Sequence, residues 1–116
     1  MAVVRKEDGT VVCARCLVAD SARTRSKGLL GRASLDEDEG ILLRPAGSIH
    51  MFFMRFPIDA VFLDRELNVL RVAAGLKPWR MASKRGAKAV LELPAGRCAH
   101  AGLAEGDRLV LDASGQ

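Results

Sequence analysis

The chain has 116 residues, of which 49% are hydrophobic and 28% charged, and its formal net charge is +4. These values suit one globular domain with its own core and exclude a disordered chain. The basic charge permits an anionic ligand without requiring one, whereas four Phe and one Trp are too few for a stacking platform on single-stranded nucleic acid. We therefore predict a single domain over residues 1–116 and no nucleic-acid partner.

No targeting signal is expected from the N-terminal residues. Residues 1–8 contain no long apolar run of the kind that a signal peptide needs. No later apolar stretch is long enough to cross a bilayer. The sequence thus predicts a cytoplasmic protein without a membrane span, in which the three cysteines are reduced thiols.

In the first part of the chain, short apolar runs alternate with turn residues. Residues 1–8 are predicted to form a strand or a loose N-terminus, and a turn leads into a β-branched strand over residues 11–19. An Asp-Ser pair follows this strand and is typical of helix N-caps, so a short helix is expected over residues 22–30. After an acidic loop, residues 41–43 are predicted to form a short apolar strand.

The middle of the chain is organised by Pro57. Residues 49–53 and 58–63 are predicted strands that bend apart at this proline, because proline removes a backbone donor from a sheet. A hairpin loop follows, in which Asn68 is the residue that best tolerates a left-handed backbone. Residues 69–76 are expected to return as a strand with an apolar face.

In the last part of the chain, an irregular basic loop is predicted over residues 77–86 and a strand over 87–93. A helix of one to two turns is expected over residues 95–101 and a strand over 108–112. Residues 113–116 are expected to form a fraying tail. Strands and helices do not alternate regularly, which argues against a doubly wound parallel sheet. The expected class is α+β: a small, mostly antiparallel, β-barrel-like or sandwich domain with two short helices.

Asp59 is the polar residue that core packing explains least. Strand alternation places it on the same face as Val61 and Leu63, and both faces of this strand are otherwise apolar. A buried carboxylate is unfavourable unless it is paired or hydrogen-bonded. Asp59 is therefore expected either to stabilise the fold or to lie at the mouth of a small pocket. In the first case it would accept hydrogen bonds from backbone amides at the Pro57 bend or pair with an arginine.

The bend at the proline also suggests a candidate ligand site. His50 and Arg55 flank an apolar run, and the bend would bring Arg55 and Asp59 together with His50 nearby. Such a cluster could bind an anion or a small polar molecule, or hold a proton-transfer pair. Trp79 and Arg80 in the basic loop would form a wall of the pocket, or Trp79 would fold back over the end of the barrel.

The cysteines raise the question of a zinc site. Cys13 and Cys16 have C-x-x-C spacing, and Cys98 with His100 would complete four ligands. Residues three apart in a strand point to opposite faces, and no Gly or Pro provides a turn between Cys13 and Cys16. We predict buried thiols that act as small hydrophobic side chains, with no metal and no cofactor. The sequence also lacks a nucleophile–base pair, so no catalytic residue is predicted.

Five segments in chain order resemble the domain-of-unknown-function 192 family: residues 26–32 (SKGLLGR), 40–43 (GILL), 49–64 (IHMFFMRFPIDAVFLD), 90–96 (VLELPAG) and 106–107 (GD). The resemblance implies a compact, β-rich, barrel-like domain with short helices and no assigned activity. Residues 50–59 are similar to the variant H-T-F-x-M-R-F-P-I-D of the family, with Met51 where a threonine is usual. The missing hydroxyl weakens any interpretation of this segment as a polar catalytic strip.

Three functions fit these patterns. The first is a non-catalytic module that binds a small molecule or an anion near the proline bend, through His50, Arg55, Asp59, Trp79 and Arg80. The second is a structural or protein-partner domain without a small-molecule site. The third is an acid/base enzyme that uses Asp59 or His50. We rank them in this order, because the sequence contains no set of residues specific for catalysis.

Overall fold

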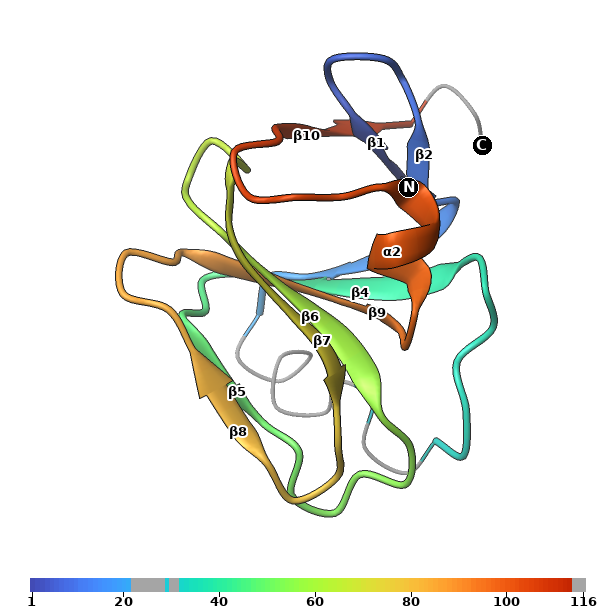
Figure 1. The fold of residues 1–116 in the computed structure, drawn as a ribbon, viewed down its shortest axis with the longest axis vertical. Coiled ribbons are helices and arrows are strands. Elements are labelled where there is room, and N and C mark those ends of the chain that lie inside the picture. The colour runs from blue at the N-terminus through green and yellow to red at the C-terminus, as the bar shows by residue number, and fades with distance from the viewer. Residues whose placement is uncertain (22–28, 30–31, 114–116) are drawn as a thin grey trace.

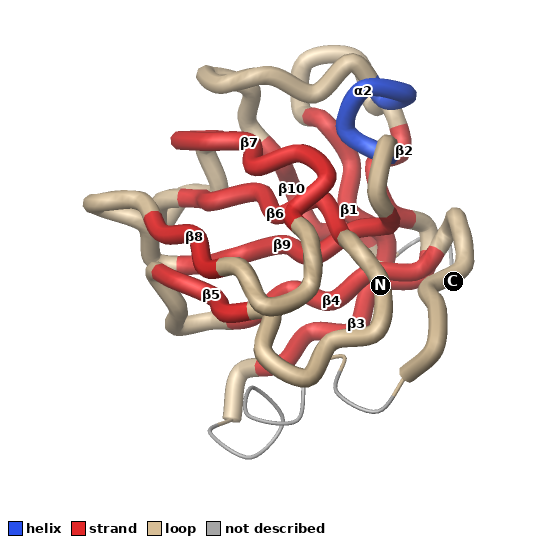
Figure 2. The backbone as a smooth tube through the Cα atoms, turned by 60° about the horizontal axis from the view of Figure 1, so that its bottom comes forward, coloured by secondary structure: helices blue, strands red, loops and turns tan. Residues whose placement is uncertain are grey.

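The computed structural model describes residues 1–21, 29 and 32–113. Its centre is a five-stranded sheet with the spatial order β3-β4-β9-β6-β7 (Figures 1 and 2). The strands are β3 (Arg15–Ala19), β4 (Glu39–Leu43), β6 (Ile58–Leu63), β7 (Val69–Leu76) and β9 (Ala89–Pro94). β3 and β4 are parallel, and every other neighbouring pair in this sheet is antiparallel. The mostly antiparallel sheet predicted from the sequence is confirmed.

Each face of the central sheet is covered by a separate layer (Figure 1). On one side lie the three-stranded sheet β10-β1-β2 and the helix α2: β1 (Ala2–Arg5), β2 (Val11–Cys13), α2 (Arg97–Ala101) and β10 (Leu109–Asp112). On the other side lies a two-stranded sheet, β5 (Ser48–His50) and β8 (Met81–Ser83). Because β6 lies inside the central sheet and under both layers, all six of its residues are buried.

Two groups of buried side chains fill these layers. The α2-side core includes Val3, Val12, Leu42, Val61, Leu91, Cys98 and Leu109. The β8-side core includes Ile41, Ile49, Met51, Ile58, Phe62 and Val90. Alternate residues of β6 contribute to the two cores, as the period of two in the sequence predicts.

The fold class needs two corrections. In the part of the chain that the structure describes, the strands form three sheets in layers and do not close into one barrel, so the sandwich alternative holds. One short helix, α2, is present there, and Gly102 ends it with a φ of 66°, as predicted. The other helix was expected over residues 22–30, all of which except Leu29 lie outside the described residues.

The strand predicted over residues 11–19 is two strands in two sheets. β2 ends at Cys13 and β3 begins at Arg15, so the chain bends at Ala14. β2 pairs with β1, whereas β3 pairs with β4. No Gly or Pro marks the bend, which is why the sequence did not reveal it. As a result Cys13 and Cys16 both belong to the α2-side core, and the prediction that they point to opposite faces is wrong.

The strand predicted over residues 49–53 is also shorter than expected. It ends at His50, and its partner β8 lies inside the segment predicted as an irregular loop. The two strands pair antiparallel, with Ser48 opposite Ser83 and His50 opposite Met81. Three residues are too few for an alternation of apolar and polar positions to be visible in the sequence.

The hairpin loop between β6 and β7 is confirmed, but its left-handed residue is Leu67, with a φ of 67°, and not Asn68. Asn68 stabilises the loop in another way: its backbone N–H and its side-chain amide donate hydrogen bonds of 2.8 and 3.0 Å to the Asp64 carboxylate. This side-chain bonding is what Asp and Asn commonly contribute to turns.

Gly40 is required where β4 passes the α2-side core. A Cβ at this position would lie 2.8 Å from the Sγ of Cys13 and 3.0 Å from both the carbonyl oxygen of Glu92 and the Cδ2 of Leu93. We expect Gly40→Ala to lower the free energy of unfolding by about 2 kcal/mol, because an extra methyl group overpacks a filled core. Thermal unfolding should show a loss of about 8 °C for a chain of this size.

Combining Gly40→Ala with Cys13→Ala is expected to restore part of the loss, because the nearest clashing atom is then absent. If Gly40→Ala melts at the wild-type temperature, the tight packing against Cys13 is contradicted.

Candidate functional site

Asp59 does not meet the other predicted site residues. It follows the alternation of β6 onto the face of Val61, toward the α2-side core, and it is fully buried. Its carboxylate accepts hydrogen bonds from the backbone N–H groups of Gly75 (2.8 Å), Gly96 (3.1 Å) and Cys98 (2.9 Å). Of the alternatives raised by the sequence, acceptance from backbone amides is the one present, although the donors do not come from the proline bend.

These three donors explain what Asp59 does for the fold. Gly96 occupies the N-cap position of α2 and has no side chain to cap it, and Cys98 lies in the first turn of the helix. Asp59 therefore caps this helix from a neighbouring strand and places a negative charge at its N-terminus. Gly75, with a φ of 61°, lies where the pairing of β6 with β7 shifts by one residue. The same carboxylate thus fixes a bulge and a helix start.

The segment after β5 forms a tight turn that separates buried from exposed side chains. The N–H of Met54 donates to the carbonyl of Met51 at 3.2 Å, which closes the turn. Met51 and Met54 are buried in the β8-side core, while Phe52 and Phe53 between them are exposed, Phe53 at 72%. Phe53 has a φ of 65°, a left-handed backbone that large side chains rarely adopt.

A second turn repeats this arrangement before β8. The N–H of Arg80 donates to the carbonyl of Lys77 at 3.2 Å, with Pro78 and Trp79 at the centre of the turn. Trp79 has a φ of 70° and is 59% exposed. In both turns an aromatic residue occupies the third position, where a positive φ characterises a type II turn and glycine is usual.

The backbone holds the two turns against each other. The N–H of Met51 donates to the carbonyl of Arg80 at 2.7 Å, and the N–H of Trp79 donates to the carbonyl of Met51 at 2.8 Å. These bonds continue the pairing of β5 with β8 beyond His50 and Met81. The relative position of the two turns is therefore set by backbone hydrogen bonds and does not depend on the aromatic side chains.

Four rings meet on this surface, and we call them the aromatic cluster: His50, Phe52, Phe53 and Trp79. Ring centroids are 4.8 Å apart for His50 and Phe52, 5.9 Å for Phe52 and Trp79, and 4.9 Å for Phe53 and Trp79. The last pair is edge-to-face, a favoured geometry for aromatic contacts. Two of the predicted site residues, His50 and Trp79, are thus brought together by way of Phe52.

The surroundings of the cluster are basic. Arg55 and Arg80 are exposed, and neither side chain has an ion pair or hydrogen bond with any residue that the structure describes. Residues 50–55 and 77–80, which form the aromatic cluster and its two turns, contain three Lys or Arg residues and no Asp or Glu residue. A surface of one sign attracts ligands of the opposite sign, so this part of the molecule favours anions.

Sequence reasoning missed Glu92. It lies in β9 between Leu91 and Leu93, is 6% exposed, and is the cross-strand neighbour of Ile41 and Ala60 on the β8-side face. Within the described residues its carboxyl group has no hydrogen-bond partner or ion pair. Burial alone raises its pKa to about 7. The sequence could have pointed to Glu92, because a Glu in an apolar strand is as unusual as the Asp in β6.

The thiols of Cys13 and Cys16 interact in the α2-side core. A hydrogen bond from Cys16 lowers the pKa of Cys13, and the same pairing, together with burial, raises the pKa of Cys16. Burial and the nearby Asp59 raise the pKa of Cys98 to about 12. All three cysteines are buried and free. Among the described residues no three His, Cys, Asp or Glu side chains gather closely enough to hold a metal ion.

Comparison with known proteins identifies relatives over most of the chain. A family model, DUF192, with the description "Uncharacterized ACR", matches residues 3–111. A UPF0127 protein of Thermococcus sibiricus is 34% identical over 99 residues, which cover 81% of this chain and 64% of that protein. A UPF0127 protein of Pyrococcus horikoshii is 39% identical over 83 residues, covering 68% of this chain and 71% of the other.

Two solved structures share the fold. A protein of unknown function from Novosphingobium aromaticivorans has a TM-score of 0.81 at 26% identity, over 95% of this chain and 82% of its own. A putative transcription regulator from Sinorhizobium meliloti has a TM-score of 0.79 at 22% identity, over 99% of this chain and 92% of its own. The described helix α2 is far too short to cross a membrane, and no other helix among the described residues could do so.

Proposed function

Because the chain belongs to the DUF192 family, which is described only as uncharacterized, we propose its function from the geometry of the aromatic cluster. The protein is a non-catalytic binding module for a small ligand that carries a flat ring and an anionic group. The ring of the ligand packs on Phe53 and Trp79, and its anionic group contacts Arg55, Arg80 or His50.

One observation carries this proposal: Phe53 and Trp79 are both exposed, are in ring contact, and both have a left-handed backbone. Such a conformation costs about 1–3 kcal/mol at a bulky residue and persists where the surrounding structure imposes it, typically at functional sites. A left-handed backbone at an exposed position favours glycine or asparagine, which would also be more soluble there. The presence of two large rings instead supports a surface shaped to receive a ligand.

The basic residues near the aromatic cluster support the proposal that the ligand carries an anionic group. Aromatic faces also attract cations, but the basic residues of the two turns, Arg55, Lys77 and Arg80, would repel a cationic ligand. An anion is favoured by the same charges, and an arginine can hold a carboxylate or phosphate through two parallel hydrogen bonds. Asp59 has no part in this site, because its oxygens are occupied on the other face of the sheet.

Trp79 is the single tryptophan of the chain, so its fluorescence reports directly on the cluster. We expect adenosine monophosphate, used as a ring-bearing anion, to change this fluorescence saturably. Phe53→Ala should weaken the affinity about tenfold, since stacking of a base on an aromatic side chain contributes about 1–3 kcal/mol. Adenosine, which lacks the phosphate, should bind more weakly than the monophosphate.

A matched control is Leu17→Ala, which truncates another exposed apolar residue, 59% exposed on the edge strand β3. This variant should bind the probe like the wild type. The proposal fails if millimolar probe leaves the fluorescence unchanged, or if both variants lose affinity to the same extent.

A further inference from the structure

A second concave surface lies at one edge of the central sheet and shares no residue with the aromatic cluster. β3, β4 and β6 all run in the same direction, because β9 is antiparallel to both β4 and β6 while β3 is parallel to β4. The C-terminal ends of three strands and the N-terminal end of β9 therefore meet at the same edge of the sheet.

The first residue outside each of these four strands is charged. Asp20 follows β3, Arg44 follows β4, Asp64 follows β6, and Lys88 precedes β9. The register confirms that they are neighbours: Ala19 pairs with Leu43, Leu43 with Val90, and Leu63 with Ala89. Four charged side chains are thus positioned by the ends of paired strands rather than by a long loop.

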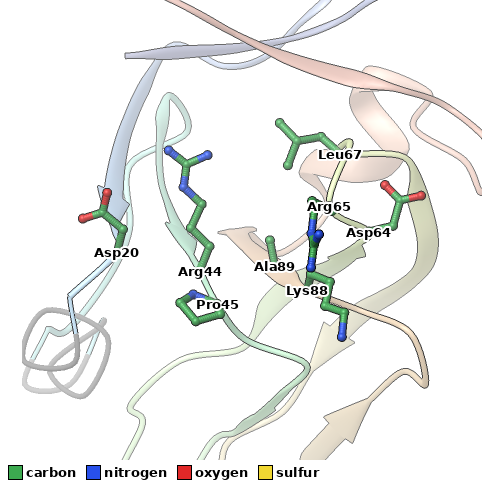
Figure 3. Close-up of a pocket in the computed structure, with 8 residues that line it drawn as sticks. All are labelled: Asp20, Arg44, Pro45, Asp64, Arg65, Leu67, Lys88 and Ala89. Atoms are coloured by element: carbon green, nitrogen blue, oxygen red, sulfur yellow. The ribbon is translucent and has the colours of Figure 1, made fainter.

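The four residues surround a cavity of about 370 Å³ (Figure 3). Pro45, Leu67 and Ala89 provide its apolar lining. Figure 3 shows Arg44 on one side of the cavity and Arg65 with Lys88 on the opposite side. A volume of this size and a mixed lining with a few charged groups are typical of a site for a small organic molecule.

Two of the cations that line this cavity, Arg65 and Lys88, remain available for a ligand. Asp64 already accepts hydrogen bonds from the backbone N–H groups of Glu66 and Asn68 and from the Asn68 side chain. Burial opposes ionisation of Asp64, but these hydrogen bonds lower its pKa below the usual range, so it stays a satisfied carboxylate. Arg65 and Lys88 have no side-chain hydrogen bond or ion pair with any of the described residues.

We propose that this cavity is a binding site for a small organic anion. Arg65 and Lys88 hold a carboxylate or phosphate group of the ligand, and Pro45 and Leu67 contact its apolar part. Both anionic groups satisfy the same donors, since arginine binds either through paired hydrogen bonds and lysine binds either as a point charge. The site is separate from the aromatic cluster and does not depend on the function proposed there.

The test uses three probes with the whole chain: phenyl phosphate, benzoate and inorganic phosphate, titrated while the backbone amides are followed by NMR. We expect saturable shifts centred on the amides of Leu67 and Ala89 with phenyl phosphate, with benzoate, or with both, which identifies the preferred anion. Inorganic phosphate should bind more weakly than phenyl phosphate, because it has no apolar part.

The variant Arg65→Gln/Lys88→Gln removes both donors from exposed positions and should weaken binding at least tenfold. Its matched control, Lys6→Gln/Lys84→Gln, removes the same net charge from two exposed lysines that do not line the cavity, and it should bind like the wild type. Equal losses in the two variants would overturn the proposal, because they would show general charge attraction. The absence of a saturable shift at Leu67 and Ala89 with every probe would also overturn it. A shift at Trp79 does not count against this cavity, because a ring-bearing anion is also expected to bind the aromatic cluster.

Discussion

Replacing Asp59 by asparagine is expected to lower the free energy of unfolding by about 3 kcal/mol. The carboxylate accepts three backbone hydrogen bonds, from Gly75, Gly96 and Cys98, and it is fully buried. An asparagine offers one acceptor oxygen, and its amide group would face an N–H donor that then has no partner. Charge-assisted bonds to a carboxylate are also about twice as strong as neutral ones.

Thermal unfolding should therefore show a loss of about 12 °C for Asp59→Asn. The control is Asp36→Asn, which removes a carboxylate whose side chain is 71% exposed and lies 3.4 Å from Arg15. Exposed pairs of this kind contribute little, so the control should change stability by less than about 0.5 kcal/mol. A wild-type melting temperature for Asp59→Asn would show that capping of α2 by Asp59 does not stabilise the fold.

Glu92→Gln is expected to raise the free energy of unfolding, in contrast to Asp59→Asn, and the size of this effect should depend on pH. The pKa of Glu92 is raised from 4.5 to about 7 by burial, so the folded state binds the proton more tightly than the unfolded state. The folded state is then favoured below pH 4.5 and loses stability as the pH rises from 4.5 to about 7. A difference of this size corresponds to about 3 kcal/mol.

The measurement is denaturant unfolding of the wild type and of Glu92→Gln at pH 4 and at pH 8. The variant cannot ionise, so it should gain about 3 kcal/mol relative to the wild type between the two values. The control Glu105→Gln, at an exposed position, should give the same difference from the wild type at both pH values. A difference for Glu92→Gln that does not change with pH would contradict ionisation of this group inside the β8-side core.

Together, these two predictions distinguish carboxyl groups on opposite faces of the same sheet. Asp59 faces the α2-side core and has three donors, whereas Glu92 faces the β8-side core and has none among the described residues. Their burial is nearly equal, at 0% and 6% exposed. Whether each substitution lowers or raises the free energy of unfolding is therefore decided by the backbone amides within reach of the carboxyl group and not by its burial.

Much of the central sheet could be predicted from the sequence. β6 and β7 were expected over residues 58–63 and 69–76, because their apolar runs are long enough for the period of two to be visible. The helix α2 was expected from residues 95–101 and its glycine at 102. The short strands β5 and β8 were not predicted correctly. They have three residues each, and their pairing depends on contacts between residues more than 30 positions apart in the sequence.

The candidate site, too, was predicted from the sequence only in part. His50 and Trp79 were selected as unusual residues, and they do lie together through Phe52. Phe52 and Phe53 were assigned to a core strand, since an apolar run in sequence cannot show that a turn at Met51 directs its middle residues to solvent. The positive φ of Phe53 was equally hidden, because it is imposed by the backbone bonds of Met51 to Trp79 and Arg80.

The sequence by itself determined the family, the strands β6, β7 and β9 of the central sheet, and the fact that a carboxylate at position 59 must have partners. These follow from local pattern and from the cost of burying charge. Only the tertiary structure decided which partners it has: Gly75, Gly96 and Cys98 lie 16, 37 and 39 residues away. The edge of the sheet that unites Arg44, Asp64 and Lys88 was set in the same way. Strand order and direction bring such residues together, and neither is encoded in the neighbourhood of any one of them.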